Sequence, residues 1–277
     1  MSSRWLTSCA LALAVSLPVG APAFAQKEIS VEDSIVRSRE PLFTQKDAWI
    51  GAGFVVATIA ARPLDNYFAD RLTNLASKEN RFLDRSFDFF EWMGSPGPFY
   101  IGPAVYALGK VTKKREIADL GLHGTEALWI GMGMVGVLKG AVGRARPFVE
   151  PRDAVNYKFG RGWKHDEYRS FPSGHALAGF AAASAITAEA GRWWPEYQWL
   201  VGVAMYGGAA GIASSRMYHN KHWASDVLVG AAIGTFAGRK VVRWHHSHPD
   251  NRLDRWLLGA SVTREESRFG ITMMLPR

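Results

Sequence analysis

Apolar residues recur along most of the chain at the spacing of helices rather than strands. Between Leu64 and Phe90, large apolar side chains follow one another at steps of three and four residues, which is the spacing of one face of an α-helix. Further apolar runs cover residues 48–61, 99–111, 117–138, 175–190, 199–213 and 224–243. The pattern therefore predicts an all-α fold.

Turn residues and charges separate these runs. The segment Gly-Ser-Pro-Gly-Pro at 94–98 predicts a turn, and a basic, aromatic stretch at about 140–171 predicts a long loop. The run 117–138 is interrupted by three polar residues, Asp119, His123 and Glu126. Because no repeat or linker divides the runs, residues 48–243 are predicted to form one all-α domain. Residues 244–277 form a tail whose β-like stretches around residues 264–266 favour a small hairpin.

The beginning of the chain resembles an export signal. Arg4 precedes a short apolar run, and the small residues Ala23 and Ala25 mark a cleavage site, so residues 1–25 are predicted to be a signal peptide and 26–47 a polar lead-in. An uncleaved anchor is the alternative. We expect the protein to be exported to the periplasmic side of the cell envelope. The single cysteine, Cys9, excludes a disulfide framework and a cysteine-built zinc site.

Hydropathy favours a domain that does not cross the membrane. A spanning helix needs about 20 mostly apolar residues, whereas the runs here are shorter or carry charge, and the mean hydropathy is −0.08. We expect a soluble domain or one that contacts the membrane surface, with an integral inner-membrane protein as the alternative.

The charge balance points to an anionic partner. With 33 Lys and Arg against 25 Asp and Glu, the formal charge is +8, while 12% aromatic and 21% charged residues exclude a disordered chain. Basic residues concentrate between Arg144 and Arg169. Because an exported protein rarely meets nucleic acid, we expect no nucleic-acid partner and favour a phosphorylated substrate.

Two short motifs are suited to binding an anion. Lys139 and Arg146 stand seven residues apart at a predicted helix end, where both can reach one anion, and Pro147 halts the helix. In the second motif, Ser173 is a natural N-cap for the helix at 175–190. Gly174 lets an anion approach the free N–H groups there, and His175 lies in the first turn. Taken alone, each motif is also explained by an ordinary helix end.

The third motif combines Arg216 with His222 and Asp226. A spacing of four residues places the last two on one helix face, where a carboxylate can accept the imidazole Nδ1–H and leave Nε2 free as a nucleophile. An isolated pair of this kind is more often a structural hydrogen bond. Together, however, the three motifs supply the cations, the helix N-terminus and the two imidazoles that metal-free phosphoryl transfer requires.

The motifs resemble the three-part signature of the type 2 phosphatidic acid phosphatase and vanadium haloperoxidase superfamily. The matching positions are Lys139–x6–Arg146-Pro147, Pro172-Ser173-Gly174-His175 and Ser215-Arg216–x5–His222–x3–Asp226. The resemblance implies a helical bundle with the three motifs at one end. It also implies His222 as a nucleophile that forms a phosphohistidine, Asp226 as its orienting partner and His175 as the general acid. The phosphate-binding residues implied are Lys139, Arg146, Ser173, Gly174 and Arg216.

By the same resemblance, no cofactor or metal is expected, and vanadate is expected as an inhibitor or phosphate mimic. The substrate is a phosphomonoester or pyrophosphate, either a phosphorylated lipid or a soluble small molecule, and the oligomeric state is not indicated. Two alternatives remain, a vanadate-dependent haloperoxidase and a non-catalytic protein that binds anions or lipids. His245, His246 and His248 admit a metal cluster, but a polar tail after the last helix is the favoured interpretation.

Overall fold

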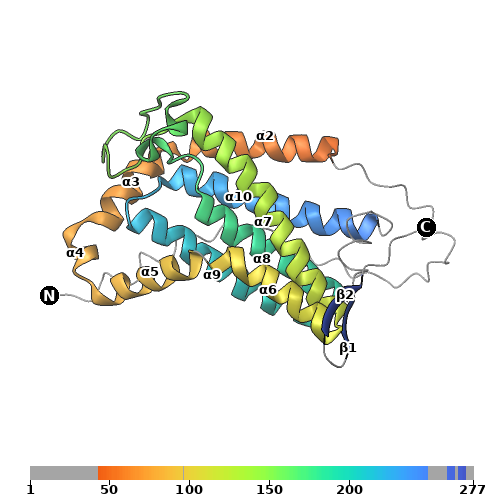
Figure 1. The fold of residues 1–277 in the computed structure, drawn as a ribbon. Coiled ribbons are helices and arrows are strands. Elements are labelled where there is room, and N and C mark those ends of the chain that lie inside the picture. The colour runs from red at the N-terminus through yellow and green to blue at the C-terminus, as the bar shows by residue number, and fades with distance from the viewer. Residues whose placement is uncertain (1–42, 96, 249–260, 266–267, 273–277) are drawn as a thin grey trace. The chain divides into compact units, whose positions relative to one another are not determined.

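The predicted all-α architecture is confirmed in the computed structural model, which describes residues 43–95, 97–248, 261–265 and 268–272 (Figure 1). The long helices are α2 (Gln45–Ala60), α3 (Arg62–Thr73), α5 (Arg81–Gly94), α6 (Gly97–Thr112), α7 (Arg115–Val142), α8 (Gly174–Trp193), α9 (Gln198–Tyr218) and α10 (Ala224–Ser247). The short ones are α4 (Leu75–Lys78), η1 (Arg161–Trp163), η2 (Asp166–Tyr168) and η3 (Pro195–Tyr197).

Local capping residues explain where the helix boundaries depart from the apolar pattern. The stretch between 64 and 90 is three helices rather than one, because Asn74 and Asn80 act as N-caps. The Asn74 side chain accepts a hydrogen bond from the Ser77 N–H at 2.9 Å, and that of Asn80 accepts one from the Phe82 N–H at 3.0 Å. The predicted turn at 94–98 is shorter, since α6 already begins at Gly97.

The helical domain extends beyond its predicted limits, residues 48 and 243, at both ends. The signal peptide at 1–25 and most of the lead-in lie outside the described residues, and α2 begins at Gln45, within the predicted lead-in. At the other end α10 continues to Ser247, so the prediction of a polar tail from residue 244 is wrong for its first residues. His245 and His246 lie in the last turn of α10, and His245 is buried. The side chains that bury it come from other helices, which a local pattern cannot reveal.

An antiparallel hairpin lies where the sequence predicts one. Strand β1 (Ser261–Glu265) pairs with β2 (Arg268–Thr272), and Ser261 stands opposite Thr272.

The centre of the bundle is α8, which packs against α7, α9 and α10. Most of its alanines are buried, and α10 approaches it closely through glycines. A Cβ atom at Gly230 would lie 2.3 Å from the Ser173 carbonyl oxygen, and one at Gly234 would lie 2.4 Å from that of Leu177. This close contact sets the start of α8 beside the start of α10, which brings the second and third motifs together.

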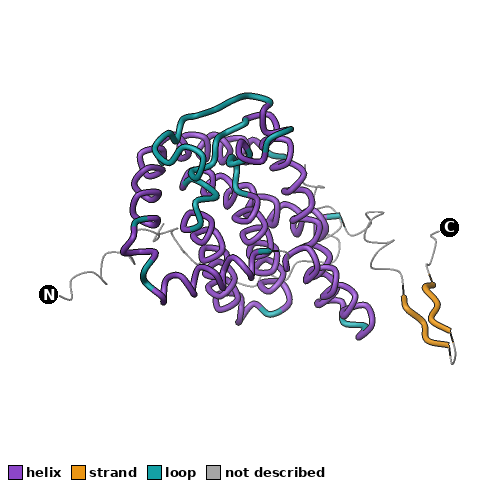
Figure 2. The backbone as a smooth tube through the Cα atoms, turned by 60° about the vertical axis from the view of Figure 1, so that its left-hand side comes forward, coloured by secondary structure: helices purple, strands orange, loops and turns teal. Residues whose placement is uncertain are grey.

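The long loop between α7 and α8 gathers at one end of the helices (Figure 2). Gly143 ends α7 in the left-handed region, with a φ of 60°, and its carbonyl accepts a hydrogen bond from the Lys158 N–H at 2.8 Å. Ala145 N–H donates to the Asn156 carbonyl at 2.9 Å. These bonds fold the basic loop back on itself and fix the exit of the first motif. Of the helices described, none has both the length and the apolar character required of a membrane span.

The α8–α10 contact predicts a large cost for one added methyl group. Gly234→Ala is expected to lower the free energy of unfolding by about 2 kcal/mol, because the new Cβ overlaps the backbone of α8. Denaturant unfolding followed by circular dichroism measures this change. Gly133→Ala on α7 is the control, since a Cβ there meets nothing within 4 Å and the better helix propensity of alanine can only stabilise it, by up to about 1 kcal/mol. Equal stability of the two variants would contradict the close packing.

Candidate active site

The three predicted motifs converge on one cavity of about 360 Å³. Six of the eight predicted site residues line it, namely Lys139, Arg146, Gly174, His175, Arg216 and His222. The other two, Ser173 and Asp226, are buried and are hydrogen-bonded to each other through their backbones, from the Ser173 N–H to the Asp226 carbonyl at 3.0 Å. The structure thus brings the predicted residues together around a single space.

A tight turn places His222 between α9 and α10. Asn220 occupies the left-handed region with a φ of 57°, and the Lys221 N–H returns to the Arg216 carbonyl at 2.9 Å. The His222 ring is buried, and its Nδ1 lies 2.6 Å from the carbonyl oxygen of Ser170. Since a carbonyl can only accept, Nδ1 carries the proton and Nε2 is left with its lone pair.

Burial and the charge of Lys139 lower the pKa of His222 to about 3. The imidazole is therefore neutral at neutral pH, which is the form that can attack an electrophile.

Asp226 orients His222 through another residue, which corrects the predicted direct contact. Its Oδ2 lies 3.9 Å from His222 Nδ1 and instead accepts hydrogen bonds from the Ser170 hydroxyl at 2.5 Å and the Trp223 N–H at 2.9 Å. The carboxylate thus holds Ser170, and the Ser170 carbonyl holds the imidazole. A spacing of four residues predicts a shared helix face, but His222 precedes the first residue of α10 and its ring turns to the loop.

Behind Asp226 lies an ion-pair network that sequence reasoning missed. Arg144 is buried and donates to Asp226 at 2.5 Å and to Asp65 of α3 at 2.7 Å. Asp65 also accepts from the Ser225 N–H at 2.7 Å. Burial alone would raise the pKa of Asp226, but the positive charge of Arg144 and the hydrogen bonds from its neighbours hold that pKa at about 2. Asp226 is therefore ionised at every physiological pH.

His175 lies in the first turn of α8, as predicted. Ser173 is the N-cap, and its hydroxyl accepts from the Ala176 N–H at 3.3 Å. Burial and the neighbouring charge of Arg216 lower the pKa of His175 to about 4. A negatively charged phosphate group beside His175 would raise this pKa and favour the protonated ring.

Arg169 also lines the cavity, and the three cationic side chains predicted to bind phosphate each have an oxygen acceptor in the protein. Lys139 donates to the Arg169 carbonyl at 2.5 Å, and Arg146 pairs with Asp166 at 3.1 Å. Arg216 forms an ion pair with Glu91 of α5. Burial, together with the charge of Arg146, lowers the pKa of Lys139 to about 7. A phosphate must compete with these acceptors, two of which, Asp166 and Glu91, were not identified from the sequence.

One part of the cavity wall is apolar and includes Phe99 of α6 with Met132 and Val135 of α7. The cavity therefore has a cationic side suited to a phosphate and an apolar side suited to a hydrocarbon group. Two groups of acidic and histidine residues among the described residues are close enough to hold a metal ion, His123 with Glu189 and His246, and Asp88 with Glu91 and His219. Neither group includes His222, His175 or Asp226.

Comparison with known proteins agrees with this geometry. Residues 122–250 match the model of the PAP2 superfamily, and this range includes all three motifs. The chain is 42% identical over 88 residues, 31% of its length, to a protein of Porphyromonas gingivalis named lipid A 1-phosphatase. The chain spans about a fifth (19%) of the length of that relative.

The fold resembles that of a solved structure. A transmembrane PAP2-type phosphatidylglycerolphosphate phosphatase from Bacillus subtilis aligns with a TM-score of 0.57 and 18% identity, over 76% of this chain and 99% of that one. For LpxE from Aquifex aeolicus the TM-score is 0.47 and the identity 20%, over 65% of this chain and 95% of that one. The family match covers the part of the chain in which the motifs converge. The segment that carries Lys139, His175 and His222 is therefore similar in sequence to the PAP2 superfamily.

Proposed function

We propose that the protein is a phosphatase that hydrolyses a lipid phosphate ester through a phosphohistidine at His222, with no metal ion in the reaction. The observation that carries this proposal is the convergence of a neutral, oriented imidazole with a second imidazole and three cations on one cavity. Lys139, Arg146 and Arg216 neutralise the phosphate oxygens, and the N-terminus of α8 adds backbone N–H donors at Gly174.

The reaction proceeds in two steps at phosphorus. Nε2 of His222 attacks, a P–N bond forms, and the P–O bond to the leaving alcohol breaks while protonated His175 donates its proton to the departing oxygen. In the second step His175 takes a proton from water, the water oxygen attacks phosphorus, and the P–N bond breaks. Inorganic phosphate leaves, and both imidazoles return to their initial states.

The cavity wall favours a lipid over a soluble ester. Phe99, Met132 and Val135 provide an apolar surface next to the phosphate-binding side, which a small polar ester would leave unused. The relative from Porphyromonas gingivalis, whose name specifies lipid A, agrees with this choice.

The surface of the bundle supports a place at the membrane, and the export signal predicted at residues 1–25 favours the outer side of the cytoplasmic membrane. Large apolar side chains are exposed on α2, α6, α7 and α9, among them Trp49, Phe54, Ile101, Trp129 and Trp199. Where such side chains form a contiguous surface, that surface is typical of membrane or protein contact. We therefore favour membrane association.

Two other functions are compatible with the same residues. A site that binds phosphate can also hold vanadate, which would support haloperoxidase chemistry, and a non-catalytic protein could bind anionic lipids. The phosphatase is favoured because hydrogen bonds fix the tautomer of His222 and because His175 lines the same cavity. Simple anion binding requires neither feature.

His222→Ala is expected to reduce phosphate release by at least about 10⁴-fold, because it removes the attacking atom. The assay uses phosphatidate in detergent micelles and p-nitrophenyl phosphate, both with EDTA. Wild-type protein is expected to release phosphate with the chelator present, and to turn over phosphatidate with the higher kcat/KM.

His165→Gln is the matched control, since His165 is half-exposed and does not line the cavity. A His222→Ala variant as active as this control would remove the nucleophile assignment. Vanadate-dependent halide oxidation without phosphate release would favour the haloperoxidase, and binding without either activity would favour the anion-binding protein. Higher kcat/KM on p-nitrophenyl phosphate would contradict the lipid preference.

The pKa of Lys139 predicts one component of the alkaline limb of the pH profile, at a higher pH than the component from protonated His175, whose pKa without substrate is about 4. With a pKa of about 7 this amine is charged below pH 7 and neutral above it, so kcat/KM is expected to fall as pH rises through 7. Lys139→Arg keeps its charge and should move this limb to higher pH. Lys158→Arg, outside the cavity lining, is the control. The second pKa of the substrate phosphate, about 6, affects all variants alike. Superimposable profiles for Lys139→Arg and wild type would contradict the role of Lys139.

A further inference from the structure

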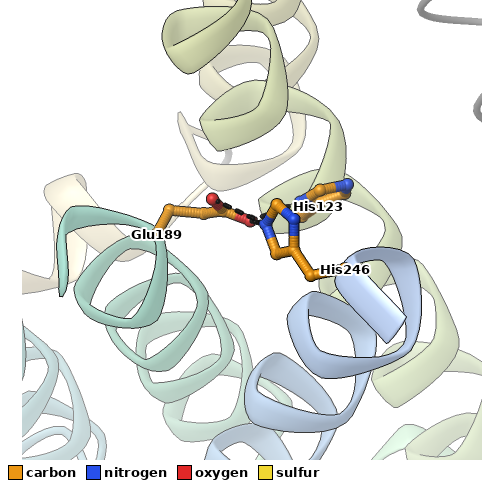
Figure 3. Close-up of side chains that lie close together, drawn as sticks. All are labelled: His123, Glu189 and His246. Atoms are coloured by element: carbon orange, nitrogen blue, oxygen red, sulfur yellow. Dashed lines mark hydrogen bonds and ion pairs between the residues drawn. The ribbon is translucent and has the colours of Figure 1, made fainter. Parts of the chain in front are cut away.

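A second polar cluster lies between helices α7, α8 and α10, and the reaction does not use it. It consists of His123, Glu189 and His246, which we call the distal cluster (Figure 3). His123 Nδ1 lies 2.5 Å from Glu189 Oε1, and His246 Nε2 lies 2.9 Å and 3.1 Å from the two Glu189 oxygens. His123 and Glu189 are 1% and 0% exposed, so two of the three side chains are fully buried.

The distal cluster is far from the catalytic cavity along each helix that builds both. On α8, Glu189 follows His175 by fourteen residues, a rise of about 21 Å, and on α10, His246 follows Asp226 by twenty residues, a rise of about 30 Å. The two sites therefore share helices and no ligand.

Unpaired polar atoms surround the distal cluster. Both carboxylate oxygens of Asp119 and the Nε2 atom of His123 are buried and have no hydrogen-bond partner among the described residues. Asp119 is one helical turn before His123 on α7 and interacts electrostatically with His123, Glu189 and His246. Arg115 is exposed, and its Nε lies 3.8 Å from Asp119, beyond hydrogen-bond distance. Buried polar groups without partners are costly, and these atoms are free to bind a ligand.

The tautomer of His123 explains the unpaired atoms. Glu189 faces both imidazoles, with His123 Nδ1 at 2.5 Å from Oε1 and His246 Nε2 at 2.9 Å and 3.1 Å from the two oxygens, and a carboxylate accepts hydrogen bonds at these positions. To donate to it, His123 must carry its proton on Nδ1, which leaves an acceptor at Nε2. The neighbouring Asp119 also offers only acceptors when ionised. A cation bound at Nδ1 would move the proton to Nε2, where Asp119 could accept it.

We propose that the distal cluster binds a divalent transition metal of the zinc class. His123 Nδ1, His246 Nε2 and one oxygen of Glu189 are the three ligands, a set that zinc accepts with a fourth position left for water. Asp119 is the outer carboxylate that receives the His123 Nε2–H, as is common around metal-bound histidines.

The distances are compatible with such a site. The three ligand atoms lie within 4.8 Å of one another, and tetrahedral zinc at about 2.0–2.1 Å from each ligand separates them by about 3.3 Å. The cluster needs to open by less than about 1 Å. Because the three ligands come from three helices, the metal would cross-link the bundle at this end and stabilise it, without taking part in turnover.

Zinc binding by untagged, full-length protein tests the proposal. The protein is stripped with a chelator, dialysed and titrated with ZnCl₂, and bound zinc is measured by elemental analysis together with the melting temperature. We expect one tightly held zinc per chain and a rise of about 5 °C in melting temperature at saturation. Glu189→Gln and His246→Gln are each expected to weaken binding at least tenfold. Asp119→Asn should weaken it about 10-fold to 100-fold while keeping one site.

His165→Gln is again the control and should bind zinc like wild type, because His165 is on the long loop and outside the cluster. Asp88→Asn tests the other candidate group, formed with Glu91 and His219. The proposal is overturned if the folded wild-type protein retains no zinc, if Glu189→Gln and His246→Gln bind as wild type does, or if Asp88→Asn alone abolishes binding. Circular dichroism establishes that each variant compared is folded.

Discussion

The catalytic end of the bundle is organised around one buried guanidinium. Arg144 lies between Asp65 of α3 and Asp226 of α10 and also donates to the Ala154 carbonyl of the long loop, at 2.6 Å. Removing one partner from such a buried pair leaves an uncompensated charge, at a typical cost of about 3–5 kcal/mol. Since Asp226 fixes Ser170 and the Ser170 carbonyl orients the His222 ring, the direction of Nε2 depends on a charge that never contacts the substrate-binding cavity.

Features that depend only on residues close together in the sequence could be predicted from it. The N-cap at Ser173, the placement of His175 in the first turn and most helices are local properties of the chain. The pairing of Arg144 with Asp65 spans 79 residues, and neither residue differs locally from an ordinary surface charge. The hydrogen bond predicted from His222 Nδ1 to Asp226 is not formed for a related reason, because the acceptor is the Ser170 carbonyl brought in by the loop, and the Asp226 carboxylate lies 3.9 Å away.

Polar residues within apolar segments were a signal of the buried cluster, and the sequence analysis made little use of them. Asp119, His123 and Glu126 interrupt the run at 117–138, and His245 and His246 follow an apolar helix face. Each alone resembles a solvated position. In the fold they meet across helices, His245 with Glu126 at 2.5 Å and His246 with Glu189. Polar residues that interrupt apolar segments on separate helices, at the same level of the bundle, therefore indicate a shared buried site.

The central claim is that a phosphoryl group is transferred to the Nε2 atom of His222. Rapid quenching of the turnover reaction at alkaline pH, followed by peptide mass spectrometry, tests this claim directly. The account predicts an acid-labile phosphoryl group on the peptide that contains His222, formed during turnover and absent from the His222→Ala variant. A phosphoryl group on another residue, or turnover with no phosphorylated peptide under conditions that preserve phosphohistidine, would contradict it.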